Sequence, residues 1–158
     1  MTQPAPTFAV DRMLGRLAKW LHLIGVDARY GPQWSGAALV RLARTERRTI
    51  LTRDRRLRRV NEPPPILFIE SDHFREQLRQ VIETYAIDPY AQLLTRCACC
   101  GERLEAVAKA RVVSRVPEYV FATQNEFVRC PHCHRLYWPA THAERVRAEL
   151  TRLGYPSA

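Results

Sequence analysis

The chain has 158 residues, of which 46% are hydrophobic and 26% are charged, a composition that is normal for a globular protein. Its formal net charge is +9, and no run of 18 or more apolar residues occurs, which excludes a membrane-spanning helix. The segment Met1–Thr7 lacks the basic region and apolar core of a signal peptide, so we expect a cytoplasmic protein.

The first part of the chain alternates predicted strands with predicted helices. In the first helix, apolar residues from Leu14 to Ile24 recur at helical spacing, and Gly25 is a stop signal. The predicted strands are 8–10, 26–30, 49–52 and 66–69, and the predicted helices are 12–24, 37–44 and 73–85. This order predicts an α/β fold with a mainly parallel sheet flanked by helices.

Between the third and fourth predicted strands the chain is strongly basic. Residues 54–60 are predicted to form a basic helix or turn, and three successive prolines at 63–65 then interrupt the chain. From Arg41 to Arg59, nine arginines stand against Glu46 and Asp54, a local balance of +7. This density suits contacts with phosphates. A solvated helix face would show the same pattern, and codon bias would explain the scarcity of lysine.

The character of the sequence changes after Arg96, where paired cysteines and short β-branched runs appear (Val112–Val113 and Tyr119–Phe121). Residues 87–95 resemble a linker, and 142–153 is a predicted last helix. We therefore divide the chain into an α/β domain at 1–90 and a small second module at 91–158.

The second module contains two Cys-x-x-Cys pairs separated by 29 residues, Cys97 with Cys100 and Cys130 with Cys133. Each pair can place two thiolates on one tetrahedral zinc ion, so the four cysteines predict a structural zinc ribbon with no open coordination position. Cys99 has unsuitable spacing as a ligand.

Several other residues of the second module lie near the predicted zinc site in the sequence. We interpret His132, His134 and His142 as packing or surface residues rather than ligands. Tyr137 and Trp138 are interpreted first as packing beside the zinc and second as stacking platforms for bases.

Aspartates follow three of the predicted strands. Asp11 and Asp54 each end an apolar strand, and Asp72 follows the fourth strand. The carboxyl ends of parallel strands share one edge, where paired carboxylates suit magnesium or manganese. Asp54 and Asp72 would also be explained as helix caps. Asp27 begins its strand, so we place it at the opposite edge with a structural role.

Four arginines lie next to these acids in the sequence: Arg12, Arg16, Arg53 and Arg55. They could hold an RNA backbone or offset charge in the transition state. Salt bridges to the acids are the alternative for each of them.

These motifs together resemble the Mut-seven C-terminal RNase-like domain family, which is similar to PIN-type nucleases and carries an appended zinc ribbon. The resemblance rests on the motifs beginning at Asp11, Gly25, Ile50, Arg96 and Cys130, and it extends from about Phe8 to Leu150. It implies a PIN-like fold and metal-dependent RNase activity with Asp11 and Asp54 in the acidic cluster. One departure is that the helix after the second strand begins without a carboxylate, in Trp34–Leu39.

Three functions follow from these observations. The first is a ribonuclease that uses magnesium or manganese to hydrolyse RNA phosphodiester bonds, with Asp11, Asp54 and Asp72 as the catalytic acids. The second is a non-catalytic RNA-binding module on a PIN-like scaffold. The third is a protein-interaction adaptor that uses the zinc ribbon. RNA is the expected partner, with DNA as an alternative substrate and no membrane association.

Overall fold

The computed structural model describes residues 3–139 and 141–157. The first part of the chain forms a four-stranded sheet in the order β2–β1–β3–β4, and every neighbouring pair is parallel. This confirms the predicted sheet. The strands are β1 (Thr7–Val10), β2 (Asp27–Arg29), β3 (Thr49–Thr52) and β4 (Ile66–Phe68).

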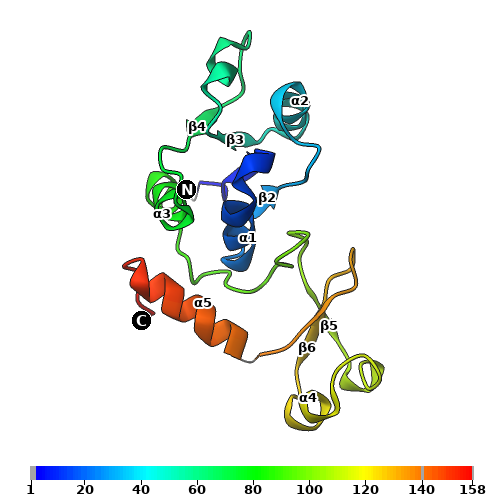
Figure 1. The fold of residues 1–158 in the computed structure, drawn as a ribbon. Helices are drawn as coiled ribbons and strands as arrows, with labels where there is room; N and C mark the ends of the chain where they lie inside the picture. The colour runs from blue at the N-terminus through cyan, green and yellow to red at the C-terminus, as the bar shows by residue number, and fades with distance from the viewer. Residues whose placement is uncertain (1–2, 140, 158) are drawn as a thin grey trace.

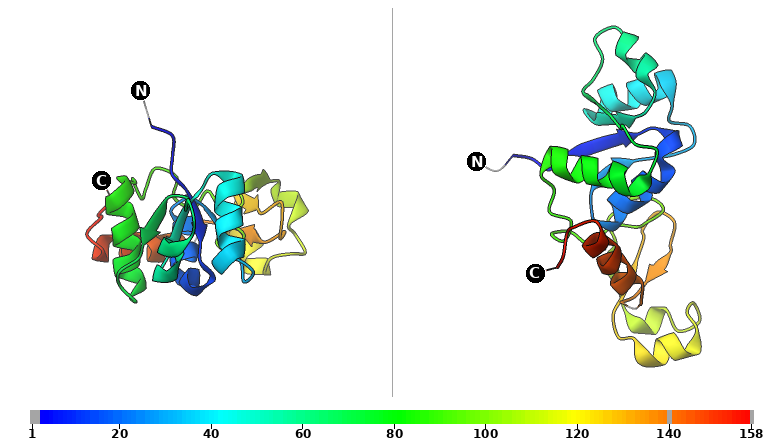
Figure 2. Two further views of the ribbon diagram at one scale, coloured as in Figure 1. Left: turned by 90° about the horizontal axis from the view of Figure 1, so that it is seen from above. Right: turned by 60° about the vertical axis from the view of Figure 1, so that its left-hand side comes forward.

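Helices cover both faces of this sheet, as the left view of Figure 2 shows. Side chains alternate along a strand, so Phe8 and Val10 join one core with α1 and α3, whereas Ala9 joins a second core under α2. The helices are α1 (Gly15–Leu23), α2 (Gly36–Glu46) and α3 (Phe74–Tyr85). The predicted first helix starts with a separate 3-10 turn, η1 (Arg12–Leu14).

Two local features of the sequence have the expected structural effect. Gly25 follows α1 with φ +83°, and a Cβ built there would lie 2.1 Å from the carbonyl oxygen of Gln92, so only glycine fits. The basic segment after β3 is a 3-10 helix, η2 (Arg55–Arg59), which projects with its loop beyond the sheet in Figure 1.

The second part contains an antiparallel three-stranded sheet, β5 (Glu105–Val107), β6 (Phe127–Arg129) and β7 (Leu136–Tyr137). Neither β-branched run forms a strand. Val112 follows the 3-10 turn η3 (Lys109–Arg111), and Tyr119–Phe121 lies inside α4 (Glu118–Thr123). Tertiary packing overrides strand propensity here, because α4 buries Val120 in a small core with Val112 and Phe127.

The last helix, α5 (Thr141–Arg152), returns to the first part of the chain and lies beside α1 and α3, as Figure 1 and the right view of Figure 2 show. Its buried side chains Val146 and Leu150 belong to the same core cluster as Phe8 and Leu78. The helix therefore follows the zinc-ribbon segment in sequence but joins the first core in space. Within the described residues, no helix is both long and apolar enough to cross a membrane.

Candidate functional site

Asp11 lies immediately after β1 and is almost completely buried, with 2% of its surface exposed. Its backbone N–H donates to the carbonyl oxygen of Leu51 at 2.9 Å, which fixes the residue at the carboxyl end of the sheet beside β3. Its Oδ2 accepts a hydrogen bond from Thr52 Oγ1 at 2.7 Å, and its Oδ1 accepts one from the N–H of Met13 at 3.5 Å. Asp11 therefore begins η1 and holds a fixed orientation.

Thr52 joins the two aspartates that follow β1 and β3. Its hydroxyl donates to Asp11 and accepts a hydrogen bond from the backbone N–H of Asp54 at 2.9 Å. Thr52 is fully buried, so this linkage lies inside the edge of the sheet rather than in water. The sequence analysis did not select Thr52, although its position as the last strand residue before Arg53 and Asp54 was a usable signal.

Asp54 is bound by Arg56, which belongs to the basic segment but is not among the four arginines selected from the sequence. Arg56 donates from Nε to Asp54 Oδ1 at 2.9 Å and from Nη2 to Oδ2 at 3.0 Å, and its backbone N–H donates to Oδ1 at 3.0 Å. The side-chain hydrogen bond from Arg56 is the main cause that lowers the pKa of Asp54. The Arg56 side chain is 86% exposed, and such surface pairs contribute little stability.

Asp72 lies at the same end of the sheet, in the segment between β4 and α3. It lines a cavity of about 250 Å³ with Met13 and Arg16. It does not cap α3 by a hydrogen bond: the N-cap is His73, which has no side-chain cap bond, and Ser71 Oγ accepts the His73 N–H at 3.0 Å. The structure thus places Asp72 near η1, where Asp11 begins the turn.

The three aspartates do not form a closed ligand cluster. Over the described ranges, the group of three or more His, Cys, Asp or Glu ligand atoms lying within 4.8 Å of one another consists of cysteines only. The first turn of α2 also contributes no acid, and its preceding loop lies at this edge because Arg12 N–H donates to Trp34 O at 2.9 Å. The edge therefore carries Asp11 and Asp54, which Thr52 links from the Asp11 carboxylate to the Asp54 backbone, and Asp72 lines the neighbouring cavity.

Asp27 has the structural position that its place in the sequence predicts. It begins β2, and its Oδ1 accepts a hydrogen bond from Arg48 Nη1 at 2.9 Å. The same guanidinium nitrogen donates to the carbonyl oxygen of Phe8 at 3.3 Å. This ion pair fastens the amino ends of β1 and β2, away from the carboxyl edge.

The four selected arginines surround the edge. Arg16 lies over the Phe74 ring at 3.8 Å, Arg55 lies 5.8 Å from the Phe68 ring centroid, and Arg53 donates to Glu70 O at 3.4 Å. Arg12 is exposed. Across the part of the chain that the structure describes, none of the four forms a salt bridge with the three aspartates. Their side chains therefore remain available to an anionic ligand.

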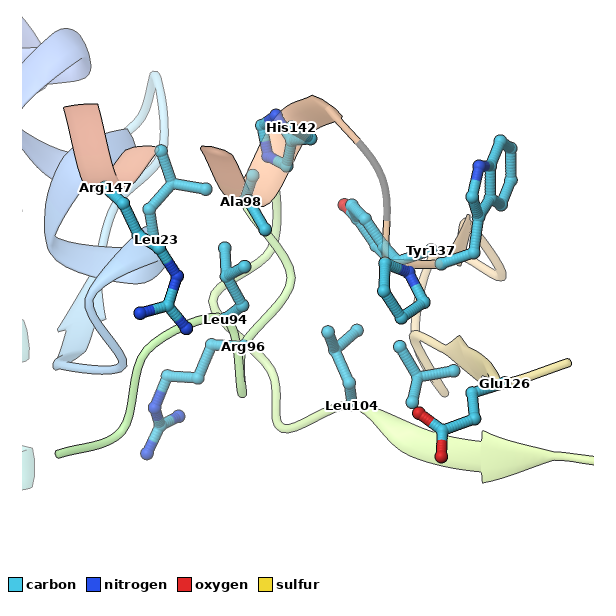
Figure 3. Close-up of a pocket in the computed structure, with 13 residues that line it drawn as sticks. Leu23, Leu94, Arg96, Ala98, Leu104, Glu126, Tyr137, His142 and Arg147 are labelled. Carbon is cyan, nitrogen blue, oxygen red and sulfur yellow. The ribbon is translucent and has the colours of Figure 1, made fainter. Parts of the chain in front are cut away.

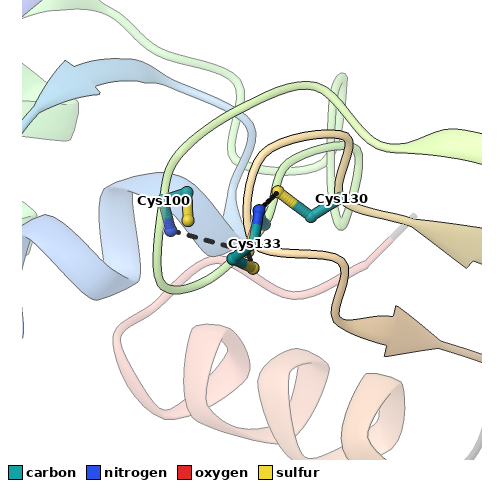
Figure 4. Close-up of side chains that lie close together, drawn as sticks. Cys100, Cys130 and Cys133 are labelled. Atoms are coloured by element: carbon teal, nitrogen blue, oxygen red, sulfur yellow. Dashed lines mark hydrogen bonds between the residues drawn. The ribbon is translucent and has the colours of Figure 1, made fainter.

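The second candidate centre is the cysteine cluster. The Sγ atoms of Cys97, Cys100, Cys130 and Cys133 all lie within 4.8 Å of one another. Figure 4 shows the labelled members Cys100, Cys130 and Cys133 turned toward a common centre. Cys99 is exposed and outside this group. The four thiol groups could hold a metal such as zinc, for which tetrahedral sulfur coordination is typical.

The backbone of each Cys-x-x-Cys turn favours thiolates. The N–H of Cys100 donates to Cys97 Sγ at 3.5 Å, and the N–H of Cys133 donates to Cys130 Sγ at 3.4 Å. Burial and neighbouring cysteines raise the pKa of Cys100 above its ordinary value. Against burial, the Arg135 backbone N–H and neighbouring cysteines lower the pKa of Cys133 to about 7. A bound metal ion would stabilise the thiolate form of all four side chains.

The side chain of His22 connects the first part of the chain to the segment of the cysteine cluster, and Tyr137 packs beside the cluster from β7. The ring of His22 is buried in α1, with Nε2 2.7 Å from Ala28 O and Nδ1 3.1 Å from Ala98 O. Gly101 packs against this ring at φ +74°, where a Cβ would lie 2.5 Å from Nε2. The Tyr137 hydroxyl lies 3.1 Å from Cys97 Sγ, in agreement with packing beside the metal site. Sequence reasoning missed His22 because its partners are 6 and 76 residues away.

Comparison with known protein families gives a match over residues 6–150 to the model of the Mut7-C RNAse domain. The match covers nearly the whole chain, including both the carboxyl edge and the cysteine cluster. Comparison with curated proteins and with solved structures gives no match.

Proposed function

The chain belongs to the Mut7-C RNAse domain family, and from this premise we propose that it is a ribonuclease that depends on magnesium or manganese. The family gives the chain a ribonuclease-like role. The metal dependence and the acting residues are our proposal. The observation that carries it is that Asp11 and Asp54 lie at one carboxyl edge of a parallel sheet, where the Thr52 hydroxyl donates to the Asp11 carboxylate and accepts from the backbone N–H of Asp54.

The donor set suits a hard cation, because carboxylate oxygens are the ligands that magnesium and manganese prefer. Asp11 and Asp54 would hold the ion, with Asp72 at the outer side of the site. A bound ion would lower the pKa of a water molecule and offset the charge on the phosphate. Thr52 keeps the Asp11 carboxylate oriented. Arg56, whose exposed side chain can turn, would exchange Asp54 for an RNA phosphate.

The arginines around the edge support RNA as the substrate. Arg12, Arg16, Arg53 and Arg55 lie close to the aspartates in sequence or in the folded edge, and η2 adds three more exposed arginines. Guanidinium groups bind phosphate in bidentate fashion, so this region would position the backbone of a strand beside the carboxylates.

The test is cleavage of a single-stranded and a structured RNA, with the same sequences as DNA for comparison. We expect RNA cleavage that requires added manganese or magnesium and is lost in Asp11→Asn and in Asp54→Asn. The ion should be withheld rather than chelated, because a chelator would also remove metal from the cysteine cluster. Glu118→Gln, an exposed carboxylate change on α4, is the matched control. Cleavage that persists in both aspartate variants would overturn these assignments.

A non-catalytic RNA-binding role is the second candidate, and two observations favour it. The start of α2 brings no carboxylate to the edge, and both Asp54 oxygens are already bound by Arg56. This role predicts RNA binding that weakens steeply with salt and no cleavage with any divalent ion. For single strands, the slope of log affinity against log salt is about −0.7 per phosphate contact. A double variant, Arg53→Gln with Arg55→Gln, should therefore make this slope less steep by roughly 1 to 2. Metal-dependent cleavage would contradict this candidate.

A further inference from the structure

A cavity of about 320 Å³ lies where the end of α1, the linker, the zinc-ribbon segment and the start of α5 meet. We call it the junction cavity. Its walls are mainly apolar, from Leu23 at the end of α1, from Leu94 in the linker, and from Leu104, Tyr137 and Pro139 in the second part. Figure 3 shows Leu94, Leu104 and Tyr137 around one space. The volume is at the small end of ligand sites, so it suits one planar ring system rather than a larger molecule.

One wall of the junction cavity is an aromatic ring held in a fixed position. The Tyr137 hydroxyl contacts Cys97 Sγ at 3.1 Å, so the ring is anchored by the cysteine cluster. A fixed ring loses little conformational entropy when a ligand stacks on it. Aromatic rings of this kind are the platforms on which proteins stack unpaired bases.

The rim of the junction cavity is polar and mainly cationic. Arg96 and Arg147 lie on one side in Figure 3, and Glu126 lies on the other. Arg96 is fixed by donating to Gly101 O at 2.8 Å and to Gly25 O at 3.3 Å, whereas Arg147 is exposed. Guanidinium groups can bind a phosphate, and a carboxylate can accept from the amino group of a base.

A row of basic side chains leads from the carboxyl edge to this cavity. Arg12, Arg16 and Lys19 are exposed and follow the spacing i, i+4 and i+7, which places them on one side of η1 and α1. We call them the α1 basic stripe. It starts next to Asp11. It ends at Lys19, one helical turn before Leu23, which lines the cavity.

The distance from Asp11 to the cavity sets the number of nucleotides that an RNA strand would need to reach both. Twelve residues separate Asp11 from Leu23, which is about 20 Å along a helix. A stacked strand advances about 3.4 Å per nucleotide, so about six nucleotides would extend from the carboxyl edge to the cavity.

We propose that the junction cavity binds one unstacked nucleobase of a single-stranded RNA whose backbone follows the α1 basic stripe from the carboxyl edge. This inference rests on the proposed RNA-directed function. It adds a second anchoring point, which would hold the strand at a fixed distance from the carboxylates.

The test compares two strands of about twelve nucleotides, roughly twice the required length. One is an ordinary RNA, and the other has the same backbone without bases. Binding is measured without magnesium or manganese, so that the ordinary strand stays intact. We expect the wild-type protein to prefer the base-bearing strand by about tenfold, the effect of one stacked base. Leu104→Trp, which fills the cavity, should remove that preference and leave binding of the baseless strand unchanged.

Val113→Trp, an exposed change in the same module, is the matched control and should keep the preference. A second measurement uses the wild-type protein, so it does not depend on how Leu104→Trp folds. RNA carrying 4-thiouridine should crosslink on irradiation to the peptide that contains Tyr137.

The outcomes separate this inference from the proposed function. If Leu104→Trp keeps its zinc and its full base preference, or if crosslinks fall only outside the cavity walls, the cavity is not a base site while RNA binding stands. If the wild-type protein binds both strands with equal affinity, the cavity is likewise not a base site. If neither strand binds at low salt, the RNA-directed function fails and this inference fails with it.

Discussion

At the scale of single residues, the carboxyl edge depends on a hydroxyl group rather than on the acids alone. Thr52 is β-branched, which limits its χ1 rotamers, and its Oγ1 is fixed between Asp11 Oδ2 and the N–H of Asp54. The Asp11 carboxylate is therefore fixed relative to the backbone at Asp54. A buried residue of β3 thus connects the segments that follow two separate strands.

We predict that Thr52→Val destabilises the protein and weakens the edge site. Valine keeps the shape of threonine but leaves Asp11 Oδ2 and the Asp54 N–H without their partner, at a cost of about 1–3 kcal/mol. Loss of a supporting hydrogen bond of this kind typically reduces metal affinity about 10- to 100-fold. Urea unfolding and a manganese titration measure the two effects. Thr45→Val, an exposed change on α2, should alter neither, and unchanged values for Thr52→Val would contradict the prediction.

A second residue-scale prediction concerns the Asp54–Arg56 pair. The side-chain hydrogen bond from Arg56 lowers the pKa of Asp54 from its ordinary value of 3.8. Because the folded pKa is the lower one, the pair stabilises the fold fully above pH about 4. That contribution is lost as the pH falls through the lowered pKa. Arg56→Ala should raise the Asp54 pKa toward 3.8.

The measurement for this pair is the carboxyl chemical shift of Asp54 followed by NMR against pH. Arg58→Ala is the matched control, since Arg58 lies over the Phe68 ring at 4.7 Å in the same 3-10 helix. An Asp54 titration that moves equally in both variants would show that overall charge, and not the direct pair, sets the pKa.

At the scale of secondary-structure elements, the two Cys-x-x-Cys turns are closely similar. In each turn, the residue after the second cysteine has a positive φ, which is +74° for Gly101 and +66° for His134. The N–H of that residue donates to the carbonyl oxygen of the first cysteine. This backbone places both thiols of a turn on one side. The short strands β5, β6 and β7 bury little apolar surface, so a metal ion would supply much of the stability of this module.

We predict that the purified protein holds about one zinc ion per chain, and that Cys130→Ser loses it. The serine hydroxyl cannot replace the thiolate, so the module should unfold locally around β6 and β7. Cys99→Ser is the matched control and should retain the zinc, because Cys99 lies outside the cluster. Elemental analysis measures the metal, and hydrogen exchange measures the unfolding. Zinc loss in Cys99→Ser would show that the ligand set is different.

At the scale of the whole molecule, α5 connects the two parts of the chain. Leu150 is fully buried in the core that also contains α1 and α3. Polar contacts add to this packing, because Arg75 forms an ion pair with Glu149 and Arg79 donates to Leu153 O at 3.0 Å. Together with His22, these contacts fix the cysteine cluster relative to the first sheet, and they form the junction cavity as a consequence.

We predict that Leu150→Ala destabilises both parts together. The lost burial and the remaining cavity should cost about 2–5 kcal/mol. Because α5 completes the first core and follows the ribbon directly, tryptophan fluorescence and circular dichroism should report one shared transition at lower denaturant. Val113→Ala, at a side chain that is 59% exposed, should change little. Separate transitions for the two signals would show that the ribbon unfolds independently.

The sequence alone determined the features that depend on local pattern. Alternating apolar runs specified the parallel sheet with helices on both faces, since burial of apolar faces leaves few other arrangements. The spacing of Cys97, Cys100, Cys130 and Cys133 specified the cluster, because a metal site requires particular ligand types at short intervals. The ends of β1 and β3 placed Asp11 and Asp54 at one edge.

Only the tertiary structure decided the contacts between residues that are distant in sequence. It placed the Thr52 hydroxyl on the Asp11 carboxylate and the His22 ring between Ala28 O and Ala98 O. It also turned Tyr119–Phe121 into part of α4. Hydrogen bonds and packing of this kind depend on how the elements approach one another in three dimensions. Local propensity and spacing do not encode that approach, so the hydrogen bonds at the edge and the junction cavity became visible only in the folded chain.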